Sequence, residues 1–425
     1  MKFLNLAASD HGGAGVAAWR LHDALRKCGH ESSMIVLNSR SADQDVSIVP
    51  GQLSMFRVVR LARKIMMKGI SNPNYYFHDQ SLSPHLNERE LLAASRFHPD
   101  IIIVHSISHF LAFEDVRTLH KATGAPIIWN LLDMALMTGG CHYAWDCRGY
   151  MSSCHGCPAL RLEYFKDLAS RVWLEKLRAI ADLPGVVIAG STTLAEQARS
   201  SSLLGRLPIE TLLLGVSPEQ FKPRQREFER GLLGINRTGK LIFFGAQRLD
   251  QKRKGMDKLL EALSLLKKNW SSTIPLPKIL SAGDATDFKA ISSLGFEHHS
   301  LGFVNSETLS RAYAASDLFV CPSIQDSGPM MINESLMCGT PVVAFRMGVA
   351  PDLIFPGVTG EIAELGNPTS LANCIMSILM LDEPASQAMA LKCREIALQL
   401  CSPHLQAQRV IELSEQMRAG SLIGS

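Results

Sequence analysis

Short runs of uninterrupted apolar residues alternate along this chain with longer segments of helical periodicity. Strands that are buried on both faces show such runs, so the pattern predicts an α/β fold with parallel, doubly wound sheets. The number of runs exceeds what one open twisted sheet holds comfortably, which favours two sheets. The ten expected strands are Lys2–Ala7, Met34–Leu37, Ile101–Val104, Ile127–Leu132, Val186–Ala189, Thr211–Leu214, Leu241–Phe244, Ile279–Ala282, Leu318–Cys321 and Val342–Phe345.

The apolar pattern breaks near Leu214–Pro218, and a polar stretch follows before the second set of strands begins. We therefore expect two Rossmann-like domains, over residues 1–215 and 216–385, facing each other across a cleft. The first would carry a cysteine-rich insertion at 139–158. Helices are expected over 386–425, and one option is that these C-terminal helices cross back to the N-terminal domain. Ligands in such sheets bind beyond the carboxyl ends of the strands, so the cleft is the expected place of chemistry.

Composition excludes several classes of protein. The chain has 425 residues, of which 46% are hydrophobic and 20% charged, so it can build packed cores and is not globally disordered. Lys and Arg number 43 against 40 Asp and Glu, too small an excess for a protein that binds nucleic acid by bulk charge. No apolar run approaches the roughly 20 residues of a membrane span, and the run at Met1–Ala8 is too short for a signal peptide. We expect a cytoplasmic protein with reduced cysteines.

A glycine-rich turn follows the first expected strand and contains Gly12, Gly13 and Gly15. Glycines at a strand-to-helix turn let a ligand approach the backbone, and the N-terminus of the helix favours an anion. A tight turn without a ligand is the alternative, because the spacing is not that of a dinucleotide-binding fingerprint.

A cationic loop follows the first strand of the second domain. Gly245–Arg248 leads into Lys252–Gly255 and then into a helical pattern. Arg and Lys on a loop that leaves a parallel strand can bind a diphosphate, because they offer several donors to its oxygens. A solvated surface loop is the alternative reading.

Two acidic residues flank the expected start of a later helix. Pro329 suits the first helical turn and Gly339 the position just past the helix end, so the helix should begin near Gly328. Asp326 then precedes the helix N-terminus, and Glu334 lies about a turn and a half inside. One acid could contact a sugar and the other a ribose of the same ligand. Asp326 could also be a simple N-cap.

These residues together resemble a known family. Arg248, Lys254–Gly255, the Asp326-x7-Glu334 pair and Cys338–Val343 are similar to motifs of the retaining family-4 glycosyltransferases, which have the GT-B fold. The block Leu131–Pro158 resembles the bacterial branch that builds surface polysaccharide such as O-antigen, capsule or exopolysaccharide. Further stretches agree: Gly12–Gly15, Phe221–Pro223, Leu301–Phe303, Ala315–Leu318 and Gly357–Gly360.

The resemblance implies transfer of a sugar, with retention, from a nucleotide-diphosphate sugar to a saccharide acceptor that we expect to be lipid-linked. Arg248 and Lys254 would neutralise the departing diphosphate, and Glu334 would bind the nucleotide ribose. Asp326 would hold the donor sugar. The two cations and the helix end would stabilise the leaving group, so no cofactor is expected to be required for catalysis. The other donor-side positions are Gly245, Gly328, Pro329, Met330 and Met331.

The chain departs from the family pattern at two positions. The first acid of the pair is Asp326 instead of Glu, and Leu132 stands where the family often has a His that contacts the donor sugar. His105, His109 or Asp133 could take over that contact on the N-terminal side. A sugar-nucleotide 2-epimerase of the same fold and a non-catalytic nucleotide-sugar-binding protein are the alternative functions.

Two further features lie outside the donor motifs. Cys141, Cys147, Cys154 and Cys157 could form a structural zinc site, two disulfides or a set of packing thiols. The segment Met55–Ile70 alternates cations with apolar residues, which is typical of a helix on an anionic membrane surface and also of an ordinary surface helix. Its cations are Arg57, Arg60, Arg63, Lys64 and Lys68.

Overall fold

The computed structural model describes residues 1–49, 58, 61–62, 65–67, 69–80, 83, 86, 88–284 and 289–421. The chain divides into two compact units, one of Met1–Leu213 with Pro403–Ser425 and one of Leu214–Ser402. The expected boundary after residue 215 lies next to the observed one. Of the last two helices, α14 (Glu383–Leu400) belongs to the second unit and α15 (Pro403–Arg418) to the first.

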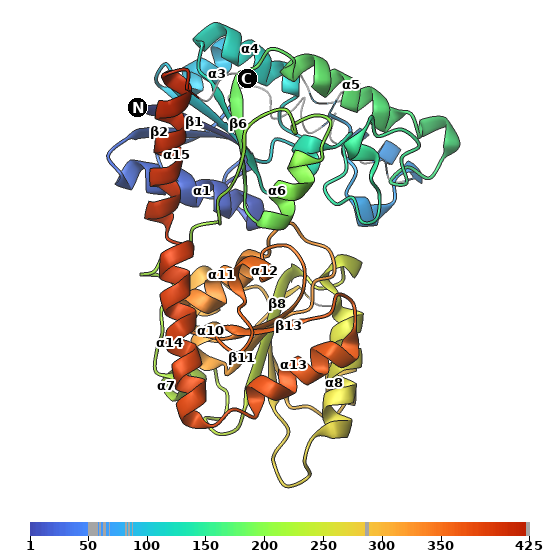
Figure 1. Cartoon of the computed structure of the whole chain (residues 1–425), viewed down its shortest axis with the longest axis vertical. Helices are drawn as coiled ribbons and strands as arrows, with labels where there is room; N and C mark the ends of the chain where they lie inside the picture. The colour runs from blue at the N-terminus through green and yellow to red at the C-terminus, as the bar shows by residue number, and fades with distance from the viewer. Residues whose placement is uncertain are drawn as a thin grey trace. The chain divides into compact units, whose positions relative to one another are not determined.

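The first unit contains a seven-stranded sheet in the order β3-β2-β1-β4-β5-β6-β7 (Figure 1). All of its strand pairs are parallel. Because the strands run in one direction, their carboxyl ends lie at one edge, where loops can gather side chains. The strands are β1 (Lys2–Ser9), β2 (Glu31–Asn38), β3 (Val46–Ile48), β4 (Ile101–Val104), β5 (Ile127–Leu131), β6 (Gly185–Ala189) and β7 (Ile209–Thr211).

Helices cover both faces of this sheet. Side chains alternate along β1, so Phe3 packs in one core cluster while Leu4 and Leu6 pack in the other. The cluster of Phe3 includes side chains of α1 and α15, and Pro403 starts α15 at the position where a missing N–H costs nothing. The helices of the unit besides α15 are α1 (Gly12–Lys27), α3 (Glu88–Ser95), α4 (Phe113–Thr123), α5 (Leu168–Ile180) and α6 (Thr192–Arg199), with 3-10 turns at Pro73–Tyr75, Ala135–Met137, Gly149–Met151 and Glu163–Phe165.

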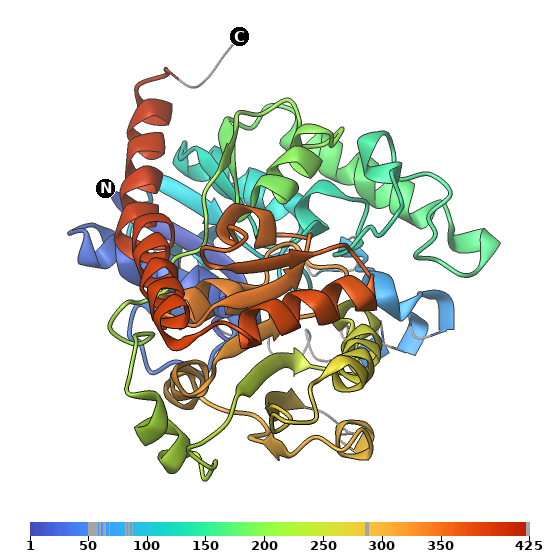
Figure 2. The ribbon, with the colours of Figure 1, turned by 60° about the horizontal axis from the view of Figure 1, so that its bottom comes forward.

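The second unit contains a six-stranded parallel sheet in the order β10-β9-β8-β11-β12-β13 (Figure 2). Strands β8 and β11 are neighbours although 69 residues separate their ends in sequence numbering, since β8 ends at Arg248 and β11 begins at Leu318. The loops that leave these two strands therefore start side by side. The strands are β8 (Leu241–Arg248), β9 (Lys278–Asp284), β10 (His298–Ser300), β11 (Leu318–Cys321), β12 (Val342–Phe345) and β13 (Gly360–Ala363).

The helices of the second unit begin at residues that suit helix starts. The Asn305 side chain accepts the backbone N–H of Thr308 at the start of α10, and Asn367 accepts those of Thr369 and Ser370 at the start of α13. These helices are α7 (Arg226–Leu232), α8 (Met256–Asn269), α9 (Lys289–Ser293), α10 (Ser306–Ala315), α11 (Met330–Met337), α12 (Ala350–Leu353), α13 (Pro368–Leu379) and α14, with a 3-10 turn at Lys252–Lys254.

The sequence pattern missed three strands and shifted one. Strands β3, β10 and β13 were not expected, and β7 lies at Ile209–Thr211 instead of Thr211–Leu214. All four are short strands at sheet edges. Edge strands bury less side-chain surface than central ones, so their sequences carry a weaker apolar signal.

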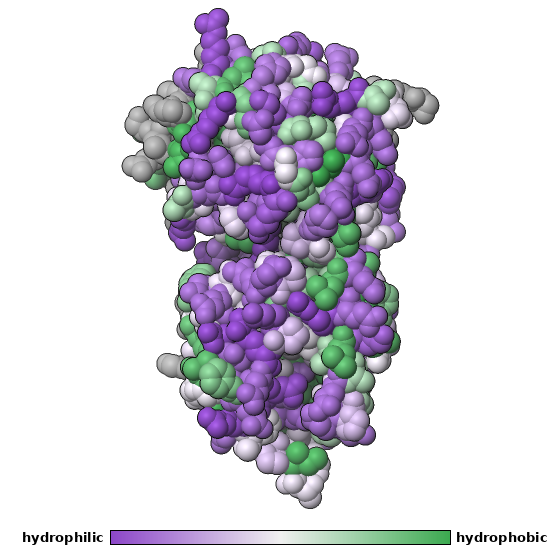
Figure 3. Space-filling view, turned by 90° about the vertical axis from the view of Figure 1, so that its left-hand side faces the viewer, coloured by the Kyte–Doolittle hydropathy of each residue, from purple (hydrophilic) through white to green (hydrophobic). Residues whose placement is uncertain are grey.

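The described residues include no helix that is both long and apolar enough to cross a membrane. The face of the molecule in Figure 3 carries mostly hydrophilic side chains, with hydrophobic ones in small groups. In the segment Met55–Ile70, all five cations that suggested membrane contact lie outside the described residues. Its described apolar side chains divide: Met67 and Ile70 are buried, whereas Val58, Leu61 and Ile65 are 61–67% exposed.

Candidate active site

The start of helix α11 forms the centre of the donor-side candidate site. Strand β11 ends at Cys321, and the chain reaches α11 at Met330, with Pro329 at the N-cap. The helix thus begins two residues later than the expected Gly328. Its first backbone N–H groups, which include those of Met330 and Met331, lack acceptors within the helix and give this end a partial positive charge.

The cationic turn at Lys252–Lys254 is hydrogen-bonded to the loop before α11. The backbone N–H groups of Ile324 and Gln325 both donate to the carbonyl of Arg253, at 2.8 and 3.2 Å. Gly255 has a φ of 65°, and a Cβ there would lie 1.9 Å from the carbonyl oxygen of Pro322. Only glycine fits at that contact, which explains why a glycine follows the cations.

Asp326 joins the cationic turn to the helix start through its side chain. One carboxylate oxygen accepts from Lys254 Nζ at 2.6 Å and from Arg253 Nη1 at 2.7 Å, and all three side chains are at most 15% exposed. Burial acts to raise the pKa of Asp326, but the charges of Lys254 and Arg253 outweigh it and hold the pKa below its ordinary value. Asp326 therefore stays ionised. Arg253 was not singled out from the sequence, since nothing in its spacing distinguishes it from Lys252.

Arg248 lies at the carboxyl end of β8 and makes a different pairing. Its guanidinium binds Asp250 on the same loop, with Nη2 2.6 Å from Oδ2, and its side chain is 57% exposed. Gly245, earlier on β8, faces the same helix start: a Cβ there would approach Met331 Cε to 2.9 Å. The structure thus brings Lys254, Asp326, Gly245 and the start of α11 together, with Arg248 on the adjoining surface.

Glu334 is buried inside α11, at 4% exposure, and accepts a hydrogen bond from the hydroxyl of Tyr313 at 3.3 Å. Burial, together with the negative charge of Glu334, raises the pKa of Tyr313 well above its ordinary value, so the hydroxyl remains a donor. This hydrogen bond fixes one carboxylate oxygen. The proposed contact of Glu334 with a ribose would be made by the other carboxylate oxygen, Oε1.

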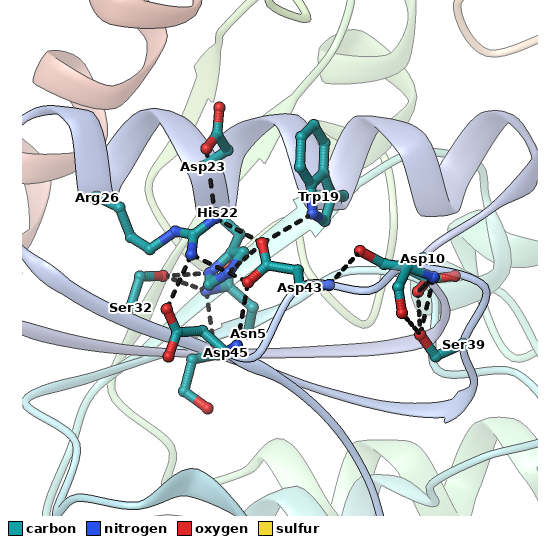
Figure 4. A network of polar contacts seen from close by, with 12 residues as sticks. Asn5, Asp10, Trp19, His22, Asp23, Arg26, Ser32, Ser39, Asp43 and Asp45 are labelled. Atoms are coloured by element: carbon teal, nitrogen blue, oxygen red, sulfur yellow. Dashed lines mark hydrogen bonds and ion pairs between the residues drawn. The ribbon is translucent and has the colours of Figure 1, made fainter.

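In the first unit, the glycine turn after β1 is held by Asp10. The Asp10 carboxylate accepts from the hydroxyl of Ser39 (Figure 4). It also accepts from the backbone N–H groups of Arg40 and Ser41, both at 3.0 Å. Burial acts to raise the pKa of Asp10, but these hydrogen bonds lower it to about 2. The carboxylate therefore ties the end of β1 to the loop after β2.

Each glycine of this turn has its own steric setting. Gly12 has a φ of 72°, and a Cβ at Gly15 would lie 2.6 Å from the carbonyl oxygen of Ser9. A Cβ at Gly13 would meet nothing within 4 Å. Gly13 is thus the position at which open space adjoins the backbone.

His105 and His109 differ in their availability to a ligand. His105 is buried: Nε2 pairs with Asn5 at 3.0 Å and Nδ1 with Asn130 at 2.8 Å, and burial lowers its pKa to about 3. The two ring nitrogens are engaged inside the sheet, so a direct contact of His105 with a sugar is not supported. His109 is exposed at the carboxyl end of β4, with a φ of 69°, and its backbone N–H donates to His78 Nε2 at 2.8 Å.

Asp133 lies two residues after the end of β5 and is paired with His142. Its carboxylate accepts from His142 Nδ1 at 2.8 Å and from the backbone N–H of Ala135 at 2.7 Å. The neighbouring Leu132 is half-buried. The sequence did not pair His142 with Asp133, because a separation of nine residues through an irregular loop predicts no contact between them.

The four clustered cysteines were candidate ligands of a structural zinc ion. Among the described residues, which include all four cysteines of the cluster, no three His, Cys, Asp or Glu side chains are placed to hold a metal ion. All four thiols are free, and no disulfide links them. Cys141, Cys154 and Cys157 are part of the hydrophobic core, and the zinc site stays a prediction.

Comparison with known proteins places this geometry in context. Residues 225–395 match the family model "Glycosyl transferases group 1". The sulfoquinovosyl transferase SQD2 of Arabidopsis thaliana is 27% identical over 331 residues, which cover 76% of this chain and 58% of that protein. The chain spans about half the length of the curated relatives that it matches.

Solved structures extend the likeness to nearly the whole chain. Anabaena HepE, in complex with UDP and glucose, has a TM-score of 0.65 at 19% identity and covers 98% of this chain and 100% of that chain. WaaG, a glycosyltransferase involved in lipopolysaccharide biosynthesis, has a TM-score of 0.58 at 15% identity, with 100% of both chains covered. At these identities the likeness establishes the fold. The solved structures thus show the two-sheet GT-B fold over nearly the whole chain, and residues 225–395, in its second unit, match the group 1 glycosyl transferase family.

Proposed function

We propose that this protein transfers a sugar, with retention of configuration, from a nucleotide-diphosphate sugar to a saccharide acceptor. The observation that carries the proposal is the ion-pair cluster of Lys254, Arg253 and Asp326 at the start of α11. It concentrates two fixed cations beside a helix N-terminus, which is a favourable environment for phosphate oxygens. The family match of the same unit and the UDP bound to HepE support a nucleotide ligand.

The chemistry follows from the charge that develops on the departing nucleotide diphosphate. As the bond from the sugar to the phosphate oxygen breaks, negative charge grows on that oxygen. Donors that are already fixed in place stabilise this charge without reorganisation. Lys254 is fixed by Asp326, and the N–H groups of α11 are fixed by the helix. Arg248 would add a second cation from the adjoining loop, and Glu334 would bind the ribose.

The acceptor is proposed to be a lipid-linked saccharide in bacterial surface polysaccharide biosynthesis, with the protein at the inner face of the plasma membrane. The involvement of WaaG in lipopolysaccharide biosynthesis and the resemblance of the block Leu131–Pro158 support this pathway. The exposed side chains of Val58, Leu61 and Ile65 support membrane contact, since their spacing puts them on one face of a helix.

Vesicle flotation tests the membrane contact. The wild type should float with vesicles that contain anionic phosphatidylglycerol, and the triple change Val58→Ser, Leu61→Ser and Ile65→Ser should reduce the floating fraction. Replacing the five cations of Met55–Ile70 with Gln should do the same. Equal flotation of both variants and the wild type would remove the membrane from the proposal.

Nucleotide release tests the transferase itself. A panel of nucleotide sugars is first ranked by the rise in melting temperature, because a ligand of the native state stabilises it. The wild type should release nucleotide diphosphate slowly from the best donor without acceptor. Lys254→Ala should lower kcat/KM by about 100-fold or more, as expected when one fixed donor is lost from a developing anion. Arg253 still pairs with Asp326 in this variant, so the fold should persist.

Lys252→Ala is the matched control, since Lys252 is an exposed cation of the same turn. It should keep the wild-type rate within about twofold, as is usual for surface changes. Interconversion of nucleotide sugars by the wild type would favour the epimerase, and binding without turnover would favour the non-catalytic protein.

A further inference from the structure

The pair of Asp133 and His142 lies at the carboxyl end of β5, the edge at which parallel sheets bind ligands. Each carboxylate oxygen of Asp133 has one donor, Oδ1 from the backbone N–H of Ala135 and Oδ2 from His142 Nδ1. The two side chains are mostly buried but reach the surface, at 13% exposure for Asp133 and 18% for His142. The pair is therefore ordered by the protein and accessible from solvent.

The protonation state of the pair follows from its hydrogen bonds. An ionised carboxylate can only accept, so the proton between the two groups lies on His142 Nδ1. In the neutral ring Nε2 is then a hydrogen-bond acceptor, and it forms no hydrogen bond within the described part of the chain.

The backbone holds His142 on both sides. Its N–H donates to the carbonyl of Tyr75 at 3.0 Å, and its carbonyl accepts from the N–H of Met134 at 3.1 Å. His142 is therefore held by three hydrogen bonds to two different segments, one through its ring and two through its backbone. An acceptor atom that is fixed in this way can select the direction of a ligand hydroxyl with little entropy cost.

Aromatic side chains lie next to this histidine. The N–H of Tyr143 also donates to the Tyr75 carbonyl, at 3.4 Å, and the Tyr143 ring meets Tyr76 edge-on with centroids 5.9 Å apart. Tyr76 is 40% exposed and has a φ of 49°, and Trp145 has a φ of 52°. Non-glycine residues with such backbone angles cluster at functional sites. Aromatic surface with a few placed polar groups is the composition of a small-molecule site.

We propose that His142, oriented by Asp133, accepts a hydrogen bond from a hydroxyl group of the acceptor saccharide, beside Tyr76 and Tyr143. The paired cations and the start of α11 lie in the second unit, within the family match, whereas Asp133 and His142 lie in the first unit. His142 is thus a binding residue and Asp133 a positioning residue. The inference rests on the proposed function and names the residues that recognise its acceptor.

Acceptor kinetics with the full-length protein test this assignment. The donor is the nucleotide sugar chosen by melting temperature, and the acceptors are a panel of p-nitrophenyl hexosides. His142→Ala should lower kcat/KM for the best hexoside by roughly 10-fold, the usual range for one hydrogen bond. Donor hydrolysis without acceptor should stay within about twofold of the wild type. His142→Gln should recover part of the loss, since its amide oxygen can accept at the same place.

Two further variants separate binding from folding. His155→Ala is the matched control, because His155 pairs with Asp167 at 3.3 Å but both side chains are 74% exposed. It should behave as the wild type. Asp133→Asn should lower kcat/KM for the hexoside as well, because an amide can donate to His142 Nδ1 and reverse which ring nitrogen accepts.

The outcomes distinguish this inference from the proposed function. The inference would be overturned if His142→Ala and His155→Ala had the same kcat/KM for the hexoside. It would also be overturned if His142→Ala lowered donor hydrolysis as much as it lowered transfer to the hexoside. If the wild type hydrolyses the donor but transfers sugar to none of the hexosides, the acceptor at this site is not a saccharide of this kind. A wild type that neither hydrolyses nor transfers would instead overturn the proposed function.

Discussion

At the scale of single residues, the carboxylate of Asp326 holds two cations together beside a helix start. Without that carboxylate, Lys254 and Arg253 would repel each other and leave two charges with little solvent. The shorter side chain of Asp, compared with the Glu of the family, reaches both cations at 2.6 and 2.7 Å. We therefore assign Asp326 a positioning role toward the cations in addition to the expected contact with the donor sugar.

Tyr313 offers a test of Glu334 that leaves the carboxylate itself intact. Tyr313→Phe removes the 3.3 Å hydrogen bond to Glu334 and keeps the aromatic packing with Phe243 and Phe319. A long hydrogen bond of this kind contributes about 1 kcal/mol, so donor affinity should fall about fivefold. Isothermal titration with the best nucleotide sugar measures this change. Tyr164→Phe, at a tyrosine that is 89% exposed, is the control. Unchanged affinity in Tyr313→Phe would separate Glu334 from nucleotide binding.

At the scale of elements, the site depends on two loops that leave neighbouring strands. β8 and β11 are adjacent in the sheet, so the cationic turn and the loop before α11 start at the same edge. Backbone hydrogen bonds to the Arg253 carbonyl and the contact of Gly255 with Pro322 then hold the two loops together. The position of Lys254 is thus set by the backbone before any side chain contributes.

Gly255→Ala should break this loop contact. The new Cβ would lie 1.9 Å from the Pro322 carbonyl oxygen at a φ of 65°, so the loops must separate. We expect the free energy of unfolding to fall by about 2–4 kcal/mol, the range for strain at a special backbone angle combined with overpacking. Urea denaturation measures it.

Gly239→Ala is the control, with a φ of 85° but no atom within 4 Å of its Cβ. Its free energy of unfolding should fall only by the cost of placing a Cβ in the left-handed backbone conformation, about 1–2 kcal/mol. Equal losses in both variants would show that the Pro322 contact is not restrictive.

At the scale of the whole molecule, the two units carry different chemistry. The second unit contains the paired cations, the start of α11 and the family match. The first unit contains the glycine turn, held by Asp10, and the Asp133–His142 pair. Each set of side chains lies at the carboxyl edge of its own sheet, which is where a doubly wound fold places its ligands.

Hydrogen exchange of the full chain should locate the nucleotide. With saturating UDP, amides in residues 245–255 and 322–332 should exchange more slowly, because a ligand suppresses local opening of the loops that it contacts. Residues 34–37 in the interior of β2 provide the control and should not change. If UDP stabilises the protein but leaves 322–332 unprotected, the nucleotide does not bind at the start of α11.

Much of the donor side could be predicted from local sequence. The apolar run at Leu318–Cys321 gives a buried strand, Pro329 and Gly339 bound a helix, and the glycine at 255 marks a positive φ. Each of these signals acts within a few residues, so the sequence carries it directly. The boundaries of β11 and α11 were therefore accurate to within about two residues, whereas β8 runs past the expected end at Phe244 as far as Arg248.

The pairing of polar side chains could not be predicted in the same way. His105 follows a strand, as a ligand-binding residue would, yet Asn5 and Asn130 on neighbouring strands take both of its ring nitrogens. Arg248 pairs with Asp250, while Arg253 shares Asp326 with Lys254. Such choices depend on strand order and loop closure, which bring together residues that are distant in the chain.

The amino-acid order by itself determined two parallel sheets, a seam near residue 214 and the positions of the acidic and cationic motifs, because burial of apolar runs and the backbone limits of Gly and Pro are local properties. Only the tertiary structure decided which charges meet, that His142 rather than His105 reaches the surface, and that Cys141, Cys154 and Cys157 pack in the hydrophobic core. The physical reason is that a hydrogen bond or ion pair needs two groups within about 3 Å, and the fold brings them that close.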